Sequence, residues 1–414
     1  MQFNATEYLA ILLIIIGGEY LFSTFVDLLN SRNDSSHVPE KLNSYYDDDK
    51  YQIALAYQKE NARFGLLNGF VSLLTVVCVI FYGLLGKLDA YFTAELSGMI
   101  PQTLAFFGVI FLVNDVMNMP FQLYSTFRIE EKYGFNNTTV KVFFLDKLKG
   151  YLFTALIGSI LLSVLILLIT YLSASFWWIF WIVISIFMIG ANFLYTSWIV
   201  PIFNKLTPLE DGELKSAIVA YGESVNFPVE NIFVIDGSKR SNKANAYFSG
   251  FGRRKKIVLF DTLVKNYTTE ELVAILAHEV GHNKLKHTIF GMVNAVIQVG
   301  FMLFVMSLMI FEPSLSEALG AMSLSFGINL IAFGIIFTPI SMLTGIIGNY
   351  LSRKHEFEAD AFAKKTYNGA FLATALKKLS VDNLSNLWPH KFYVFIHYSH
   401  PPLLKRLLAI ERSE

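Results

Sequence analysis

Seven apolar stretches, each about as long as a bilayer is thick, constrain the fold of this chain more than any other feature. Their approximate bounds are 8–29, 64–85, 101–124, 151–171, 176–200, 289–311 and 322–351. A helix that crosses the hydrocarbon core needs roughly 20 apolar residues. Charged residues make up only 16% of the chain, against about 25% in soluble domains. We therefore predict a mainly α, polytopic membrane protein with about seven transmembrane helices.

Lysine and arginine alternate between the links that join these stretches. The links that carry most of them are 30–63, 126–149, 201–288 and the tail from residue 352. The links that carry none or only one are 1–8, 86–100, 172–175 and 312–321. Because cytoplasmic loops are enriched in these residues, seven spans predict an outside N-terminus and a cytoplasmic 201–288 region. The alternative is that the interrupted third or seventh span is re-entrant.

The spans and links divide the chain into four predicted parts. Residues 1–200 contain the first five spans and two cytoplasmic loops, and residues 289–351 contain the last two spans. Residues 201–288 are the one long polar region, which we predict to be a small α+β domain. Residues 352–414 are polar and predicted to form cytoplasmic helices that complete the site of that domain.

The 201–288 region contains short runs that are typical of strands. Asn231–Ile235 and Lys256–Phe260 are rich in β-branched and aromatic residues and are separated by turn residues. Residues 245–248 lie between them and predict a third strand at the sheet edge.

A helix with the motif H-E-x-x-H follows these strands. Thr268 and Glu271 have the spacing of a capping box, and apolar residues lead from them into the motif. Residues four apart share a helix face, so His278 and His282 can bind one Zn²⁺ from the same side. Zinc lowers the pKa of a bound water to about 7, and Glu279 is placed to take its proton and pass it to a leaving amine. The motif predicts peptide hydrolysis with one zinc ion per chain; a chance match with packed or solvated histidines is the alternative.

The third zinc ligand is not determined by spacing. The segment after the last span offers His355, Glu356, Glu358 and Asp360. Glu356 and Asp360 are four apart, so one can bind the metal while the other supports it from the same face. A solvated charged face is the alternative. A cysteine site is excluded, because Cys78 is the single cysteine. The formal net charge of zero gives no indication of a nucleic-acid partner.

Several separate motifs, in order, extend this interpretation. They are E-E-K-Y-G-F-N at 130–136, the N-A-Y-F core within 241–251, H-E-V-G-H at 278–282, E-F-E-A-D at 356–360 and S-H-P-P at 399–402. With them the chain resembles, over nearly its whole length, the integral-membrane zinc metallopeptidases of the CAAX prenyl protease type, which are gluzincins.

The resemblance implies roles for individual residues. It makes Glu356 the third zinc ligand, with Asp360 in support and Arg406 as the partner of Asp360. It places Asn245 near the substrate or the oxyanion, and it makes His400 a stabiliser of the tetrahedral intermediate. A buried structural histidine is the alternative for His400. No role follows for His287, His390 or His397.

The resemblance also implies a barrel of helices around a large water-filled chamber, which the zinc domain closes at its cytoplasmic end. Polar residues at membrane depth are expected to face that chamber, because contact with lipid is costly for them. These residues are Glu19, Asn114, Asp115, Asn192 and Asn329.

The expected partners are a peptide or protein substrate, prenylated in this family, and membrane lipids, with no nucleic acid. The short non-cytoplasmic links and the lack of a terminal ER-retrieval signal indicate a compact member, in a bacterial inner membrane or an ER-type membrane, and leave the prenyl substrate open. The alternative is a quality-control zinc peptidase for membrane proteins without prenyl specificity. A third hypothesis is a non-catalytic channel or carrier, against which Glu279 argues because a purely structural zinc site does not need that acid.

Overall fold

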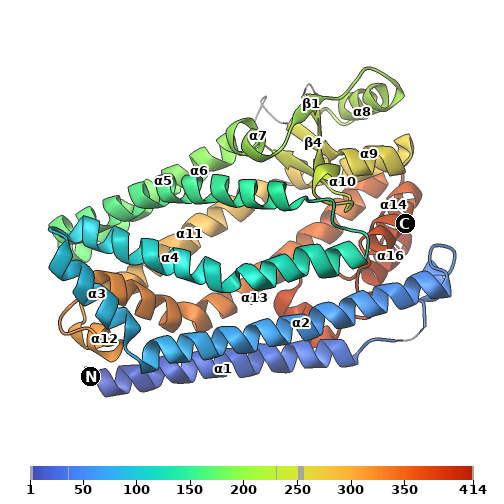
Figure 1. Cartoon of the computed structure of the whole chain (residues 1–414). Helices are drawn as coiled ribbons and strands as arrows, with labels where there is room; N and C mark the ends of the chain where they lie inside the picture. Colours follow the sequence, from blue (N-terminus) through green and yellow to red (C-terminus); the bar gives the residue numbers. More distant parts are fainter. Residues whose placement is uncertain (1–2, 36, 230, 250–255, 413–414) are drawn as a thin grey trace.

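Long helices that lie side by side make up most of this protein. The computed structural model describes residues 3–35, 37–229, 231–249 and 256–412. Figure 1 shows the long helices running from the end of the molecule that contains α3 (Leu84–Glu95) and α12 (Pro313–Ala318) to the end that contains the sheet. The long helices are α1 (Ala5–Arg32), α2 (Asp48–Phe81), α4 (Met99–Tyr124), α5 (Val140–Leu172), α6 (Phe176–Leu194), α11 (His287–Ser307) and α13 (Phe326–Thr366).

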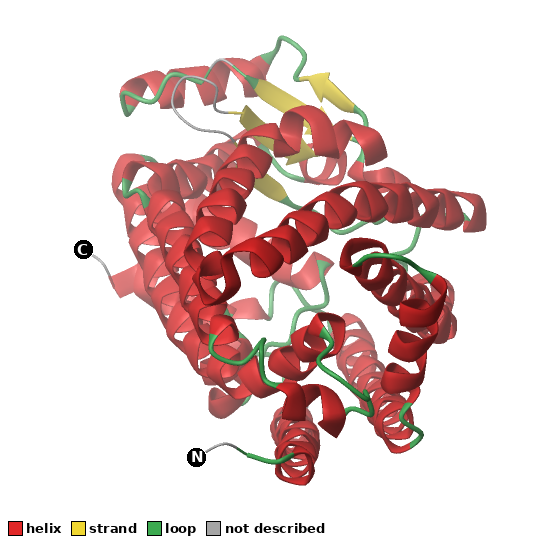
Figure 2. Ribbon diagram, turned by 90° about the vertical axis from the view of Figure 1, so that its left-hand side faces the viewer, coloured by secondary structure: helices red, strands yellow, loops and turns green. Residues whose placement is uncertain are grey.

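Six helical stretches of the described chain are long and apolar enough to cross a membrane. One of them, Val140–Phe203, contains both α5 and α6, which are separated by Ser173–Ser175 and pack against each other. Counting these two helices separately gives seven, in agreement with the predicted number. Viewed in Figure 2, the helices surround a central region, as expected for a barrel.

Three of the long helices, α2, α5 and α13, extend beyond the predicted spans by more than ten residues at one end. α13 continues without a break to Thr366, so the polar tail begins inside this helix. α2 begins at Asp48, where Asp47 caps it, and its first turns pack Tyr51, Ala54 and Tyr57 into a core that includes Leu384. These polar helix ends are held by protein contacts that hydropathy does not reveal. Because α4 and α13 are each continuous, the re-entrant alternative is wrong.

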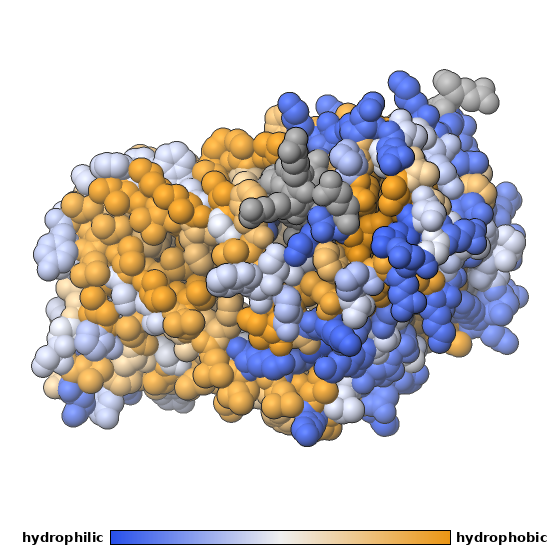
Figure 3. Space-filling view, turned by 90° about the horizontal axis from the view of Figure 1, so that it is seen from above, coloured by the Kyte–Doolittle hydropathy of each residue, from blue (hydrophilic) through white to orange (hydrophobic). Residues whose placement is uncertain are grey.

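Hydrophobic side chains cover the outside of the helical part. None of the residues in the apolar window of α2 is buried, and at most 17% are buried in any of the other windows. Figure 3 shows hydrophobic residues over the left-hand part of the molecule and hydrophilic residues over the right-hand part. This division fits a protein whose apolar helices face lipid, while its other end faces water.

The sheet has the order β1-β2-β4-β3. Its strands are β1 (Leu206–Pro208), β2 (Ile232–Ile235), β3 (Ala246–Ser249) and β4 (Lys256–Phe260). β2 and β4 are parallel, with Ile232 opposite Ile257, and the other two pairs are antiparallel. The two predicted strands and the predicted edge strand are confirmed. β1 was not predicted, because three residues that end in proline give no alternating pattern.

Shorter elements complete the structure. The remaining α-helices are α3 (Leu84–Glu95), α7 (Val200–Phe203), α8 (Glu213–Ser224), α9 (Asp261–Asn266), α10 (Thr269–Lys284), α12 (Pro313–Ala318), α14 (Gly369–Asp382), α15 (Lys391–His397) and α16 (Leu403–Arg412). The 3₁₀ turns are η1 (Glu40–Leu42), η3 (Ser173–Ser175) and η5 (Gly237–Lys239), and the π-helical turns are η2 (Ser125–Glu130) and η4 (Tyr195–Ile199). The largest core lies around α10, between α8, the sheet and α14.

The polar residues at membrane depth have different environments. Asp115 binds Lys147 of α5 at 2.6 Å and also contacts Tyr151. Asn114 lines a cavity of about 480 Å³ between α2, α3, α4 and α13, and Asn192 lines another of about 540 Å³ beside β3. Glu19 is exposed on α1.

For Asn329 the expectation of a chamber-facing residue is wrong. Its side chain is fully buried and donates to the carbonyl groups of Ile310 and Glu312, and it accepts from the Ser316 hydroxyl at 2.7 Å. Asn329 therefore ties the first turns of α13 to the segment around α12.

Candidate metal centre

α10 positions the two histidines of the H-E-x-x-H motif. The predicted capping box starts this helix, with the Thr268 hydroxyl accepting from the Glu271 amide and the Glu271 carboxylate accepting from the Thr268 amide. Apolar residues such as Leu272 and Leu276 are buried against the core. The Nε2 atoms of His278 and His282 consequently lie 3.1 Å apart on one face.

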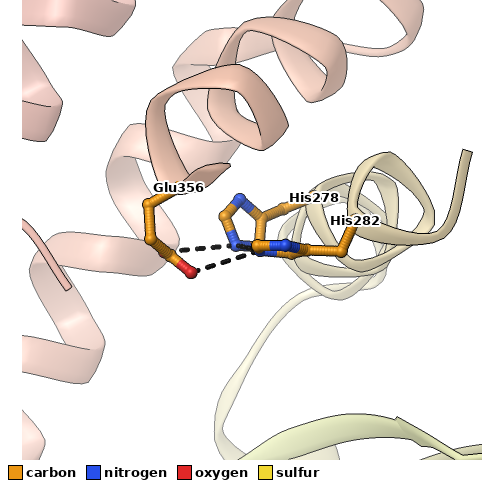
Figure 4. Close-up of side chains that lie close together, drawn as sticks. All are labelled: His278, His282 and Glu356. Atoms are coloured by element: carbon orange, nitrogen blue, oxygen red, sulfur yellow. Dashed lines mark hydrogen bonds and ion pairs between the residues drawn. The ribbon is translucent and has the colours of Figure 1, made fainter. Parts of the chain in front are cut away.

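Glu356 reaches the same point from α13. Its Oε1 lies 3.2 Å from His282 Nε2, and its Oε2 lies 3.5 Å from His278 Nε2. Figure 4 shows the three side chains pointing toward one another from the two helices. The helices approach closely at Gly281, where an added Cβ would lie 3.2 Å from the Ala359 Cα atom. A small residue at position 281 therefore helps to bring the histidines within reach of Glu356.

The spacing of the histidine nitrogens and the carboxylate oxygens suits a zinc ion. Nitrogen and oxygen ligands at 2.0–2.2 Å in a tetrahedron lie about 3.3 Å from each other. The two Nε2 atoms are 3.1 Å apart, one Glu356 oxygen lies 3.2 Å from His282 Nε2, and the other lies 3.5 Å from His278 Nε2. Glu356 Oε2 is buried and accepts no hydrogen bond, and it has an ion-pair contact with Arg406 Nη1 at 3.2 Å. A buried carboxylate oxygen of this kind is a suitable metal ligand. His278, His282 and Glu356 can therefore hold the metal.

The electrostatics of this pocket also favour a cation. Burial alone would lower the pKa of His282, but the carboxylates of Glu356 and Glu279 raise it. The pocket thus favours positive charge where the histidine nitrogens and carboxylate oxygens meet.

The other three candidate ligands lie elsewhere. Asp360 Oδ1 is 2.9 Å from Nδ1 of His278, on the side of the ring away from Glu356. His355 and Glu358 lie with His287 in a second group. Among the four candidates that spacing left open, the geometry therefore favours Glu356.

Arg406 joins the two carboxylates of α13. It donates to Asp360 through Nε at 2.8 Å and through Nη2 at 2.6 Å, and its Nη1 lies 3.2 Å from Glu356 Oε2. Burial alone would lower the pKa of Arg406, but Asp360 and Glu356 raise it, so the guanidinium keeps its charge. The structure therefore brings the predicted pair of Asp360 and Arg406 together beside His278.

Glu279 lies next to the three ligands on α10 and is half-buried. Burial raises the pKa of its carboxyl group, His278 and His282 oppose this shift, and Glu356 adds to it. A carboxyl group with a raised pKa accepts and returns a proton more readily near neutral pH. Its surroundings therefore suit a general base that later acts as an acid.

His400 lies at the rim of the group. Its Nε2 is 3.4 Å from Glu356 Oε1, and its side chain is 65% exposed. The alternative of a buried structural histidine is therefore wrong. His400 and Arg406 both line a cavity of about 570 Å³. Hydrogen bonds from Asn349 and Arg353 of α13 to carbonyl groups of α15 hold the preceding helix.

Asn245 is not joined to the three ligands by any hydrogen bond recorded for the described residues. It directly precedes β3, and its side chain is exposed and accepts a hydrogen bond from the Ala246 amide at 2.9 Å. Its backbone carbonyl accepts from Phe260. Its role near the substrate stays a prediction.

The histidines without an assigned role now have distinct positions. His287 Nδ1 lies 3.1 Å from His282 Nδ1, a contact that sequence reasoning missed. The only sequence signal for it is a histidine five residues after the motif. His390 caps α15 by accepting from the Phe392 amide, and the ring of His397 lies 4.7 Å from that of Tyr393. His397 also lines the cavity that His400 and Arg406 line, so no role is assigned to His390 or His397.

Comparisons with known proteins give the family. Residues 27–205 match the family described as CAAX prenyl protease N-terminal, five membrane helices, and residues 208–414 match peptidase family M48. The chain is 34% identical to CAAX prenyl protease 1 homolog of Oryza sativa, over 99% of each chain. It is 31% identical to CAAX prenyl protease 1 of Saccharomyces cerevisiae, over 96% of this chain and 95% of the yeast protein.

A solved structure agrees with this match. The crystal structure of S. mikatae Ste24p superposes with a TM-score of 0.91 at 30% identity, and the match covers 97% of this chain and 98% of that one. The chain belongs to peptidase family M48. It is therefore an integral, multi-pass membrane metalloendopeptidase of the CAAX prenyl protease type that acts on peptides or proteins. Because the match covers 99% of both this chain and the rice protein, short links do not distinguish this chain from the rice protein.

Proposed function

We propose that this peptidase uses one zinc ion, held by His278, His282 and Glu356, to cleave prenylated proteins near a C-terminal cysteine. The convergence of these three side chains, with Glu279 beside them, carries the proposal. Bound zinc would supply a Lewis acid and make water more acidic. The names of the rice and yeast relatives support the substrate class.

Other residues of the chain move the proton, orient a zinc ligand and stabilise the oxyanion. Glu279 takes a proton from the attacking water and returns it to the leaving amine. Asp360 accepts from Nδ1 of His278 and so holds that ring with its Nε2 toward the metal, while Arg406 holds Asp360. His400 is exposed and close to Glu356, where an imidazole N–H can donate to the developing oxyanion.

The substrate peptide is proposed to bind along β3. This strand is the last in the sheet order among the described residues. A strand edge offers backbone N–H and C=O groups to an extended peptide. Asn245, at the start of β3, then lies beside the peptide backbone, as the resemblance implied.

The peptidase end is proposed to face the cytoplasm. The links that lie at this end of the molecule (Figure 1) carry most of the Lys and Arg residues, and such residues favour the cytoplasmic side. A prenylated substrate anchored in the cytoplasmic leaflet would meet the site from that side.

A pair of peptides tests this function. Purified protein is given matched C-a-a-X peptides with and without a farnesyl group, and Glu279→Gln and a zinc chelator serve as controls. We expect strong preference for the farnesylated peptide and loss of cleavage in both controls. Equal cleavage of both peptides would favour the quality-control peptidase instead. Cleavage that survives in Glu279→Gln would contradict the catalytic role and return the non-catalytic zinc fold to consideration.

A further inference from the structure

We propose that His287 is a positioning residue that orients the zinc ligand His282, with Glu358 as its own support. The proposal rests on the metal site described above and adds a second chain of hydrogen bonds to it. His287 lies outside the H-E-x-x-H motif, at the start of α11, and is only 7% exposed.

The proton positions along this chain follow from the ligand geometry. A neutral imidazole carries one N–H, so a His282 that binds a metal through Nε2 has its proton on Nδ1. That N–H faces His287 Nδ1 at 3.1 Å, which must then accept. The proton of His287 is therefore on Nε2, 3.0 Å from the carboxylate oxygen Oε2 of Glu358. Each group donates to the next, and the chain ends on a carboxylate.

Two helices hold the His287 ring in place. Lys286, in the left-handed conformation with φ 62°, turns the chain between α10 and α11, so His287 folds back toward His282. From α13, the His355 ring stacks on the His287 ring, with the ring centroids 4.0 Å apart and an interplanar angle of 8°. The turn at Lys286 and the stacked His355 ring thus fix the position of His287.

The geometry argues against a second metal site at His287, His355 and Glu358, although their ligand atoms lie within 4.8 Å of one another. The lone pair of an imidazole nitrogen lies in the plane of its ring, so two stacked, nearly parallel rings hold their lone pairs in separate planes that do not meet at one ion. In addition, a His287 that accepts at Nδ1 carries its proton on Nε2 and has no lone pair there for a cation.

The two zinc-binding histidines therefore have unequal support. Asp360 and Arg406, which support His278, are buried. Glu358 is 42% exposed on its side chain, so water can replace it in part. We expect the loss of His287 to matter more than the loss of Glu358.

The test measures zinc affinity of the purified full chain by competition with a chelator. We expect His287→Ala to weaken zinc binding on the order of 10- to 100-fold, as the loss of a partner to a metal-binding histidine generally does. His287→Asn should bind zinc nearly as well as the unaltered chain, because its Oδ1 lies where Nδ1 lies in histidine and can accept from His282. Glu358→Ala should weaken binding less than tenfold. His37→Ala, at an exposed histidine, is the control and should bind as the unaltered chain does.

Two further measurements separate orientation from general damage. The visible spectrum of the Co²⁺-substituted protein should change in His287→Ala and stay unchanged in His287→Asn. If His287→Ala does not fold, His287→Phe takes its place, because it keeps the stacked ring and lacks the acceptor.

The outcomes distinguish the two proposals. Full affinity in both His287→Ala and His287→Phe would overturn the inference, as would equally weak binding in His287→Asn and His287→Ala. Failure of the unaltered chain to bind zinc would instead contradict the proposed metal site.

Discussion

The helices α10 and α2 are both rich in apolar residues, yet they have opposite surroundings. In α10, residues 271–278 are buried without a gap. In the apolar window of α2, no residue is buried within the protein. The apolar residues of α10 contact other protein side chains, and those of α2 face lipid or the space enclosed by the helices.

This difference shows which part of the protein must be packed most accurately. The site needs His278, His282 and Glu356 within a few tenths of an ångström, and close packing of α10 supplies that accuracy. The apolar window of α2 only has to remain apolar and helical, whereas the first turns of α2 pack into a protein core. Substitutions around α10 should therefore be costly, and matched substitutions on α2 should be mild.

The largest effect is expected at the contact between α10 and α13. Glu356→Ala removes a carboxylate 3.2 Å from His282, and only two zinc ligands then remain. We expect this variant to lose its zinc and with it all peptidase activity. Metal content after dialysis measures the loss. Glu358→Ala, two residues away on α13, is the control and should retain zinc; the reverse result would show that the ligand assignment is wrong.

Glu279→Gln should have the next largest effect. The amide keeps the size of the side chain but cannot take a proton, so we expect kcat to fall roughly 10²- to 10⁴-fold. The zinc content should stay at one per chain, because Glu279 is not among the three ligands. Steady-state kinetics and metal analysis on the same preparation check both points. A variant that lost zinc as well would place Glu279 among the ligands.

The contrast between α10 and α2 also explains what the sequence could predict. Apolar stretches of about 20 residues identify membrane spans such as α2, because the bilayer sets their length. Hydropathy could not reveal that α13 continues to Thr366 or that α2 begins at Asp48, since protein packing holds those ends.

Within the site, local spacing identified the residues on α10 but not the residues of other helices that contact them. His278, Glu279 and His282 form one motif on one helix. The choice of Glu356 among four candidates came from the resemblance, because spacing gives no distance between α10 and α13. His287 was missed for the same reason: its ring reaches His282 through the turn at Lys286.

A core substitution tests the packing directly. Leu276 on α10 is 2% exposed, and Leu276→Ala leaves a cavity beside the site. We expect a loss of about 2–5 kcal/mol in the free energy of unfolding. Leu74→Ala on α2 is the matched control: Leu74 is 47% exposed, and lipid is as apolar as leucine. Thermal unfolding in one detergent compares the two. Similar losses in both variants would show that α2 is packed as tightly as α10.

The smallest effect should come from adding one methyl group. In α10, a Cβ at Gly281 would lie 3.2 Å from the Ala359 Cα and the Phe362 Cβ of α13, whereas at Gly65 in α2 nothing lies within 4 Å. Overpacking lowers the free energy of unfolding by about 1–3 kcal/mol. The better helix propensity of alanine raises it by up to about 1 kcal/mol. We therefore expect Gly281→Ala to destabilise the protein by about 1 kcal/mol and to weaken zinc binding, because it separates the histidines from Glu356. Gly65→Ala improves the helix propensity and disturbs no contact, so it should be neutral or slightly stabilising. If Gly281→Ala kept full zinc affinity, the close approach of α13 to Gly281 would not determine the distances between the zinc ligands.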